Sequence, residues 1–194
     1  MRKKVTIYCL KLHNFLYKLI SKLSFEKGIH PKHRIINYHK FFLDNINSED
    51  VVLDIGCGNG FLTFDIAKKA KKVVALEKNS SYLKEAEKKN SSSNIRYFLC
   101  DATSYRSEER FSVLILSNVL EHIENRIDFL RNIKRFSEKI LIRVPMINRD
   151  WITLYKKELG VEWRLDKTHF TEYTLLSFQE ELKCAGLMIK EYSV

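Results

Sequence analysis

The chain has 194 residues, 45% of them hydrophobic, which suits one folded domain with a substantial core and excludes a disordered chain. Its four cysteines are scattered without a C-x-x-C pair, which excludes a disulfide framework or a zinc knuckle and indicates a reducing cytoplasm. The net charge of +10 is concentrated at the start, because residues 1–40 carry ten Lys or Arg against one acid and the remaining residues carry 24 against 23.

The first predicted element is a basic amphipathic helix over residues 5–23, within an N-terminal helical segment that we place at residues 1–47. Its apolar residues recur at every third or fourth position, the period of one helix face: Val5, Tyr8, Leu12, Phe15, Leu16, Leu19 and Leu23. Lysines interrupt this segment too often for it to be a signal-peptide core or a membrane span, which needs ~20 apolar residues. Two roles stay open, a helix that packs on the domain as a lid and a helix that lies on an anionic membrane. We therefore expect a cytoplasmic protein that can contact a membrane surface through residues 1–24.

A linker at residues 28–34 and a helix at residues 35–45 precede the main domain, which we place at residues 48–194. That domain opens with an apolar run at residues 51–55, interrupted only by Asp54 near its end. The run has no helical period, as expected for a parallel strand that is covered on both faces.

The turn after this strand contains Gly56, Gly58 and Gly60 at alternate positions, with Cys57 between the first two, and a helix over residues 61–70 follows. Glycines spaced so closely provide backbone freedom and close approach to a bound molecule. Open α/β sheets bind nucleotide-like ligands at such a turn. The dinucleotide fingerprint G-x-G-x-x-G spaces its third glycine differently, so a dinucleotide site is the second choice here.

The next two predicted strands, at residues 72–77 and 95–99, each deliver an acid at or just after their end. Glu77 lies 21 residues after Gly56, the distance at which an acid can accept hydrogen bonds from ribose hydroxyls. Asp101 follows the second of these strands. A helix separates the two strands, as in a βαβ unit.

Strands and helices continue to alternate, which predicts a single-domain Rossmann-like α/β fold: a mostly parallel sheet with helices on both faces. The remaining elements are a strand at 111–116, a helix at 128–136, a strand at 139–144, an irregular insertion at 146–167, a final helix that Thr171 caps and Gly186 ends, and a last strand at 187–194.

The segment from Asp54 to Gly60 reads D-x-G-x-G-x-G and resembles motif I of the class I methyltransferases that use S-adenosylmethionine. Glu77, Asp101 and the Leu120-Glu121-His122 stretch follow in the order of that family, so the resemblance covers the chain from about Asp50 onward. It implies that the cofactor contacts the residues of motif I: Asp54, Gly56, Cys57, Gly58 and Gly60. The family's sheet normally ends with a sixth and a seventh strand, yet only one predicted strand follows the final helix. The resemblance therefore implies a truncated chain or a sheet without its seventh strand.

The same resemblance assigns roles outside motif I. It implies that Asp101 takes the adenine amino group, with the amide of Ala102 on the ring, and that Asn118 also binds the cofactor. Arg34, just before the nucleotide-binding unit with Tyr38, could supply a cation for the methionine carboxylate, and simple solvated charge is the alternative.

His122 is the first candidate for a general base toward a hydroxyl acceptor, because its pKa lies near neutral pH. A histidine that only holds the loop is the competing interpretation. The spacing Asn118-x-x-Glu121-His122 also resembles the metal-binding E-x-x-E-H motif of some O-methyltransferases, some of which add a histidine where His169 stands. Glu121, His122 and His169 could then hold a divalent cation, although Asn118 replaces the first glutamate and weakens that case, so a metal-free site is the first expectation.

The D-x-x-H-F-T stretch at residues 166–171 is similar to methyltransferases found with surface-polysaccharide synthesis. We expect a small-molecule, sugar or lipid-linked acceptor that is methylated on oxygen. Three alternatives stay open: a nucleic-acid methyltransferase that uses the basic segment on phosphates, a non-catalytic protein that binds S-adenosylmethionine, and an NAD-dependent reductase.

Overall fold

The computed structural model describes residues 1–26 and 30–193, so part of the expected linker at 28–34 lies outside the described residues. It begins with three helices: α1 (Arg2–Leu23), α2 (Lys32–Ile35) and α3 (Lys40–Asp44). The prediction of one helix over residues 35–45 was wrong. Asn37 has a φ of 44°, in the left-handed region, and a residue there interrupts a right-handed helix.

Five parallel strands form one sheet in the order β3-β2-β1-β4-β5: β1 (Val51–Ile55), β2 (Lys72–Glu77), β3 (Ile95–Leu99), β4 (Val113–Ser117) and β5 (Ile140–Arg143). The elements that follow the strands are α4 (Phe61–Ala67), α5 (Ser80–Lys89), η1 (Leu120–His122), α6 (Arg126–Ile133), η2 (Lys134–Phe136), η3 (Ile147–Arg149), α7 (Trp151–Glu158) and α8 (Leu175–Cys184). The predicted fold class is confirmed.

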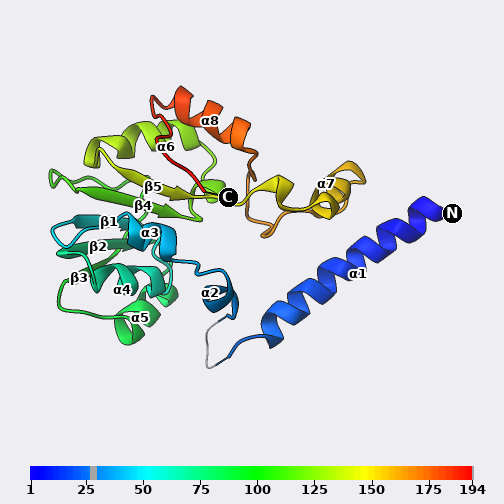
Figure 1. The fold of residues 1–194 in the computed structure, drawn as a ribbon, viewed down its shortest axis with the longest axis horizontal. Helices are drawn as coiled ribbons and strands as arrows, with labels where there is room; N and C mark the ends of the chain where they lie inside the picture. The colour runs from blue at the N-terminus through cyan, green and yellow to red at the C-terminus, as the bar shows by residue number, and fades with distance from the viewer. Residues whose placement is uncertain (27–29, 194) are drawn as a thin grey trace.

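Helices cover both faces of the sheet (Figure 1). Alternate residues of β1 point to opposite faces, as the pleat of a strand requires. Leu53 packs with α6 and α8, whereas Val52 packs with α3 and α4. The order of the strands reverses between β1 and β4, and the chain leaves both at their carboxyl ends. Ligands of open α/β sheets bind at this switch point.

The segment between β5 and α8 is more regular than expected. It contains α7. Asp150 caps the start of this helix, where its side chain accepts a hydrogen bond from the Thr153 amide at 2.6 Å. Thr171 is not the cap of the final helix, since the backbone around Tyr173 lies in extended form beside Pro145–Ile147, with two backbone hydrogen bonds. α8 therefore begins later, with Thr174 as its cap.

The prediction of a strand at residues 187–194 was wrong over the described residues 187–193, and Val194 lies outside them. Gly186 ends α8 in the left-handed region, with a φ of 73°. The chain that follows packs Leu187 and Ile189 against the core next to α6 and α8 rather than pairing with the sheet. The described residues thus form a sheet with neither the sixth nor the seventh strand of the fold.

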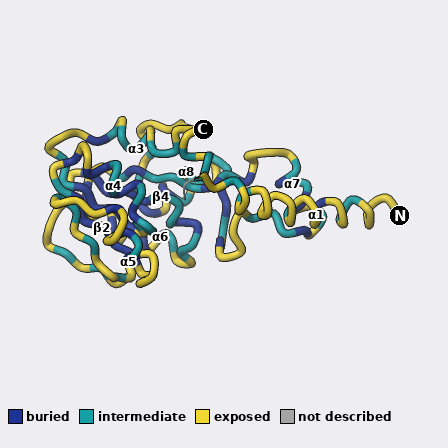
Figure 2. Tube along the Cα trace, turned by 90° about the horizontal axis from the view of Figure 1, so that it is seen from below, coloured by how far each residue is buried: buried dark blue, intermediate teal, exposed yellow. Residues whose placement is uncertain are grey.

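α1 extends beyond the sheet and its helices, and most of it is exposed (Figure 2). It contacts the segment around α7, where the Asn14 side-chain amide donates to the Glu162 carbonyl at 2.7 Å. None of the helices within the described residues is both long enough and apolar enough to cross a membrane.

Candidate active site

The glycine turn connects β1 to α4, and all three of its glycines have a positive φ. The amides of Gly56 and Cys57 donate to the Leu76 carbonyl of β2, at 2.8 and 3.0 Å, which fixes the start of the turn. A Cβ atom on Gly60 would lie 2.6 Å from the Tyr97 hydroxyl, whereas a Cβ atom on Gly58 would meet no atom within 4 Å. Gly60 is therefore required by packing, and Gly58 faces open space at the carboxyl edge of the sheet.

Glu77 lies at the end of β2 beside this open space. One carboxylate oxygen accepts from the Gly58 amide at 2.9 Å and the other accepts from the Asn79 amide at 2.7 Å. Each oxygen keeps a second lone pair for a ligand hydroxyl. The turn and the acid that the sequence predicted to act together are thus joined by a hydrogen bond.

Asp54 is buried at the end of β1, where its carboxylate accepts from the Thr63 hydroxyl of α4 at 2.6 Å. Burial raises the pKa of this carboxyl to about 6. Asp54 stabilises the glycine turn, because its side chain connects β1 to α4, the helix that follows the glycines.

Asp101 and Ala102 follow β3, next to β2 in the sheet. The Asp101 side chain is exposed and accepts from both the amide and the hydroxyl of Thr103, hydrogen bonds that lower its pKa. Ala102 packs against the core. Both residues lie at the same edge of the sheet as Glu77, since the strands are parallel.

Arg34 is not brought to this edge by any described contact. Its side chain is 70% exposed, and its guanidinium lies 3.7 Å from the Glu26 carboxylate. The cation at the edge is instead Arg143, the last residue of β5, which the sequence analysis missed. A charged residue at the carboxyl end of a predicted strand was the signal that could have identified it.

Arg143 is the centre of a polar group under the N-terminal segment. It donates to the Asn118 side-chain oxygen at 3.0 Å and to the Ser117 hydroxyl at 2.5 Å, and its guanidinium lies 3.4 Å from the centroid of the Tyr38 ring. Burial lowers its pKa. The Tyr38 hydroxyl also donates to Asn118, at 2.9 Å. Asn118 has a φ of 58°, and these contacts hold it there.

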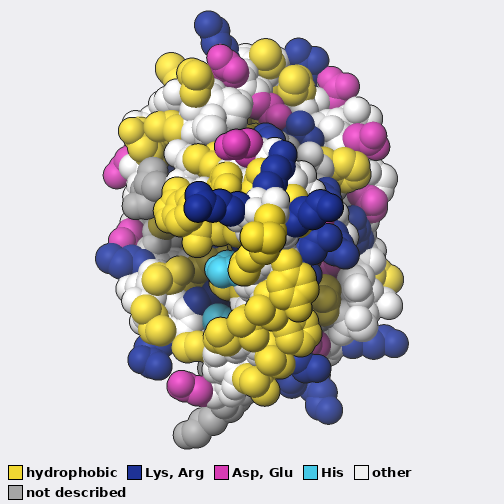
Figure 3. All heavy atoms as spheres, turned by 90° about the vertical axis from the view of Figure 1, so that its right-hand side faces the viewer, with side chains coloured by type: hydrophobic (Ala, Val, Ile, Leu, Met, Phe, Trp, Pro, Cys, Tyr) yellow, Lys and Arg dark blue, Asp and Glu magenta, His cyan; other side chains and the backbone are white. Residues whose placement is uncertain are grey.

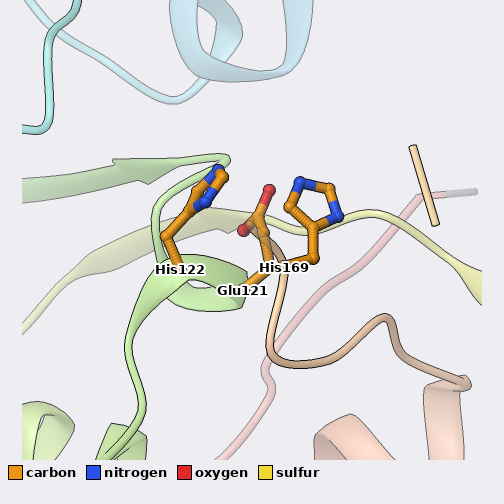
Figure 4. A group of neighbouring side chains, drawn as sticks. All are labelled: Glu121, His122 and His169. Atoms are coloured by element: carbon orange, nitrogen blue, oxygen red, sulfur yellow. The ribbon is translucent and has the colours of Figure 1, made fainter. Parts of the chain in front are cut away.

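Glu121, His122 and His169 lie together, with potential ligand atoms all within 4.8 Å of one another. Their side chains point toward a common point, with Glu121 between the two imidazoles (Figure 4). Glu121 and His122 belong to η1, whereas His169 comes from the segment before α8. The Phe170 amide, which donates to the Glu121 carbonyl at 2.8 Å, joins the two segments.

The surroundings of the three side chains differ. Glu121 is fully buried, burial raises its pKa, and one of its oxygens has no hydrogen-bond partner among the described residues. His122 lies 3.0 Å from the Thr168 hydroxyl, and burial together with His169 lowers its pKa. The buried His169 places Nδ1 3.0 Å from Glu172. A proton on that nitrogen would leave Nε2 with its lone pair toward the cluster.

Comparisons with known proteins agree with this arrangement. A family model described as a methyltransferase domain matches residues 52–139, the part that holds the glycine turn, Glu77, Asp101 and the Glu121-His122 pair. Residues 52–139 therefore form a methyltransferase domain of the class I, S-adenosylmethionine-dependent type. The matched part runs from β1 almost to β5.

The individual relatives are named for different acceptors. The chain is 32% identical to the (S)-coclaurine N-methyltransferase of Thalictrum flavum subsp. glaucum over 45% of its length and 26% of that protein. It is 29% identical to an uncharacterised RNA methyltransferase of Leptospira interrogans over 63% of the chain and 33% of that protein. The solved plantazolicin methyltransferase BpumL, in complex with S-adenosylhomocysteine, has a similar fold, with a TM-score of 0.61, 18% identity, and coverage of 79% of this chain and 63% of that chain.

The matches span about half or less of the length of the curated relatives. The family model covers the part from β1 to α6. The parts of the chain that lie outside the matched family model include α1, α7 and His169.

Proposed function

We propose that this methyltransferase binds S-adenosylmethionine over the glycine turn and transfers its methyl group to a hydroxyl of a small-molecule, sugar or lipid-linked acceptor. The observation that carries the proposal is the pairing of Gly58 with Glu77, which combines open space, a free backbone and a carboxylate at the switch point of the sheet. Glu77 would hold the ribose hydroxyls, and Asp101 with Ala102 would hold the adenine. S-adenosylmethionine supplies an activated methyl group with a good leaving group, so positioning provides much of the acceleration.

Isothermal titration with S-adenosylhomocysteine tests the cofactor site. Glu77→Gln removes a charge while keeping the shape of the side chain, and we expect about 10- to 100-fold weaker binding. Glu87→Gln makes the same change at an exposed position of α5 and serves as the control. Equal affinities of the two variants would contradict the proposed position of the cofactor.

The three residues of the Glu121-His122-His169 cluster support a hydroxyl acceptor. An oxygen nucleophile must lose a proton, and His122, with its lowered pKa, is neutral at pH 7 and can accept it. Glu121 and His169 would orient the acceptor and His122. Arg143, rather than Arg34, is the cation that we propose for the methionine carboxylate, because it lies with Asn118 at the same edge.

The donor set of this cluster also fits a divalent cation. A carboxylate oxygen without a partner and two imidazoles form a mixed oxygen and nitrogen set, and Glu172 on His169 is the outer partner typical of metal-binding histidines. A bound cation would lower the pKa of the acceptor hydroxyl. Titration calorimetry with Mn²⁺ on the wild type and on Glu121→Gln tests for the site without relying on turnover.

We also propose that α1 contacts an anionic membrane. The face of α1 that docks on the domain contains Ile7, Leu10 and Asn14, which are buried or half-buried. The stripe of apolar residues predicted from the sequence lies on another face and is exposed: Val5, Tyr8, Leu12, Phe15, Leu16, Leu19 and Leu23. Residues 1–25 carry six Lys or Arg and no acid. Apolar side chains beside cations are the pattern of a helix that lies in a lipid interface.

An RNA acceptor is the second candidate, and the same basic helix together with the RNA methyltransferase relative favours it. RNA binding through phosphates does not need exposed apolar side chains, whereas nine of them lie along α1. Transfer of labelled methyl from S-adenosylmethionine tests this candidate. Label in RNA, rather than in small molecules or lipids, would support an RNA acceptor.

A further inference from the structure

A cleft of about 430 Å³ lies between α1 and the segment from η3 to Lys167. Two contacts between these segments accompany it: Asn14 donates to the Glu162 carbonyl at 2.7 Å, and the Lys156 ammonium lies 3.1 Å from Nδ1 of His13. α7 lies close to α1 in the fold (Figure 1), although more than 120 residues separate them in the sequence. The cleft is thus built by the parts of the chain that lie outside the matched methyltransferase model.

Basic side chains dominate the lining of this cleft. Seven of its lining residues are basic and two are acidic; the basic ones are Lys11, His13, Lys18, Arg149, Lys156, Arg164 and Lys167. Both acids already have partners. Arg164 donates twice to Glu162, at 2.9 Å each, which lowers the pKa of Glu162 to about 2. Asp150 caps α7, and its carboxylate lies 4.0 Å from Arg149.

Lys156 is the most deeply buried cation of the lining. It is only 7% exposed, and no ion pair within 4.0 Å joins its ammonium to a carboxylate of the described residues, although the charge of Asp150 compensates part of it. Burial lowers its pKa. A buried ammonium without an ion pair is costly, and the neighbouring lysines of α1 add to the excess of positive charge. An anion in the cleft would relieve this cost.

Three aromatic side chains also line the cleft and narrow the class of anion. Phe15, Tyr17 and Trp163 line the cleft, and the Lys157 ammonium lies 5.0 Å from the centroid of the Trp163 ring. A flat aromatic surface packs against a ring or an apolar chain, whereas a bare inorganic ion gains nothing from it. The lining therefore fits a phosphate group that is attached to an organic body.

One side chain connects the lining of the cleft to the candidate active site. Glu172 forms an ion pair with Arg149, which lines the cleft, and its carboxylate lies 3.0 Å from Nδ1 of His169. The Glu172 carboxylate is fully buried between them. A molecule held in the cleft thus lies next to the segment that carries His169.

We propose that this cleft binds the phosphate or diphosphate group of the methyl acceptor, with Lys156 as the central cation. The inference rests on the proposed function, because it assigns the charge class of the same acceptor. A soluble sugar phosphate and a phosphate headgroup of a lipid share this chemistry. Hydrophobic side chains gather over the end of the molecule where α1 begins, with Lys and Arg beside them (Figure 3), so either source can reach the cleft.

The test uses inorganic pyrophosphate and the fluorescence of Trp163. Trp151→Phe removes the second tryptophan, which is exposed on α7, so that the signal reports the cleft. In this background Lys156→Met keeps the length of a buried side chain and removes its charge. Lys84→Met makes the same change on the exposed face of α5 as the control. We expect saturable binding that Lys156→Met weakens about tenfold or more. Lys84→Met leaves that binding unchanged, and S-adenosylhomocysteine affinity is the same in both variants.

Vesicles of phosphatidylglycerol distinguish the two sources. Competition between the vesicles and pyrophosphate supports the cleft as a site for a lipid phosphate, and independent binding supports it as a site for a soluble phosphate. Equal pyrophosphate affinities of Lys156→Met and Lys84→Met overturn the proposal. If the wild type binds pyrophosphate but transfers no methyl group, the proposed function is contradicted and the anion site still stands.

Discussion

Gly58 and Gly60 belong to one turn, yet their substitution has different consequences. Alanine at either position costs about 1–2 kcal/mol, because both residues have a positive φ. Gly60→Ala adds a clash with Tyr97 and Ala86, and we expect a further loss of about 1–3 kcal/mol. Gly58→Ala meets only open space, so it should spare the fold and fill the place of the cofactor. Urea unfolding and calorimetry with S-adenosylhomocysteine measure the two effects. Gly58→Ala binding S-adenosylhomocysteine as tightly as the wild type would contradict the assignment.

Asp54 makes stability depend on pH. Because its folded pKa of about 6 lies above the unfolded value of 3.8, the folded state holds the proton more tightly, and this carboxyl lowers stability as pH rises from 4 to 6. Asp54→Asn removes the buried charge and keeps an acceptor for Thr63. We expect the variant to be more stable than the wild type by on the order of 3 kcal/mol at pH 8, with the difference disappearing toward pH 4. A variant less stable at pH 8 would show that the charge itself is needed for the fold.

His122 provides a prediction about catalysis. His122→Ala should lower kcat by about 10²- to 10⁴-fold while S-adenosylhomocysteine affinity stays unchanged. Added imidazole should restore part of the rate if His122 acts as the base. A histidine that only holds η1 through Thr168 would show no rescue.

At the scale of elements, one face of α1 contacts the domain and another face carries the exposed apolar stripe. Phe15→Glu with Leu19→Glu places two charges in that stripe, and we expect sedimentation with anionic vesicles to fall about tenfold or more. Leu176→Glu with Met188→Glu adds the same charge at exposed apolar positions of the C-terminal part and is the matched control. If both double variants sediment alike, the stripe of α1 does not bind lipid.

The sequence predicted those elements whose pattern is local. The apolar run of β1, the glycine turn and the strand ending in Glu77 were correct because burial on both faces and backbone freedom are visible in the residues themselves. Tertiary pairing produced the differences. Thr171 looked like a helix cap, but pairing of Tyr173 with the chain after β5 delays α8.

At the scale of the molecule, the arrangement of the site depends on contacts that no local pattern reports. Arg143 reaches Asn118 and Tyr38 only because β5 lies beside β4 and the N-terminal segment folds over their ends. His169 meets Glu121 and His122 across 47 residues of sequence. The sequence resemblance predicted that meeting, while the roles of the three residues stay predictions.

The most direct test of the central claim is transfer of labelled methyl from S-adenosylmethionine into an extract of the source cells, counted in separate small-molecule, lipid, protein and nucleic-acid fractions. We predict label in the small-molecule or lipid fraction with the wild type, and its loss with Glu77→Gln. Label in RNA would contradict the proposed acceptor. No label in any fraction from a protein that binds S-adenosylhomocysteine would contradict catalysis itself.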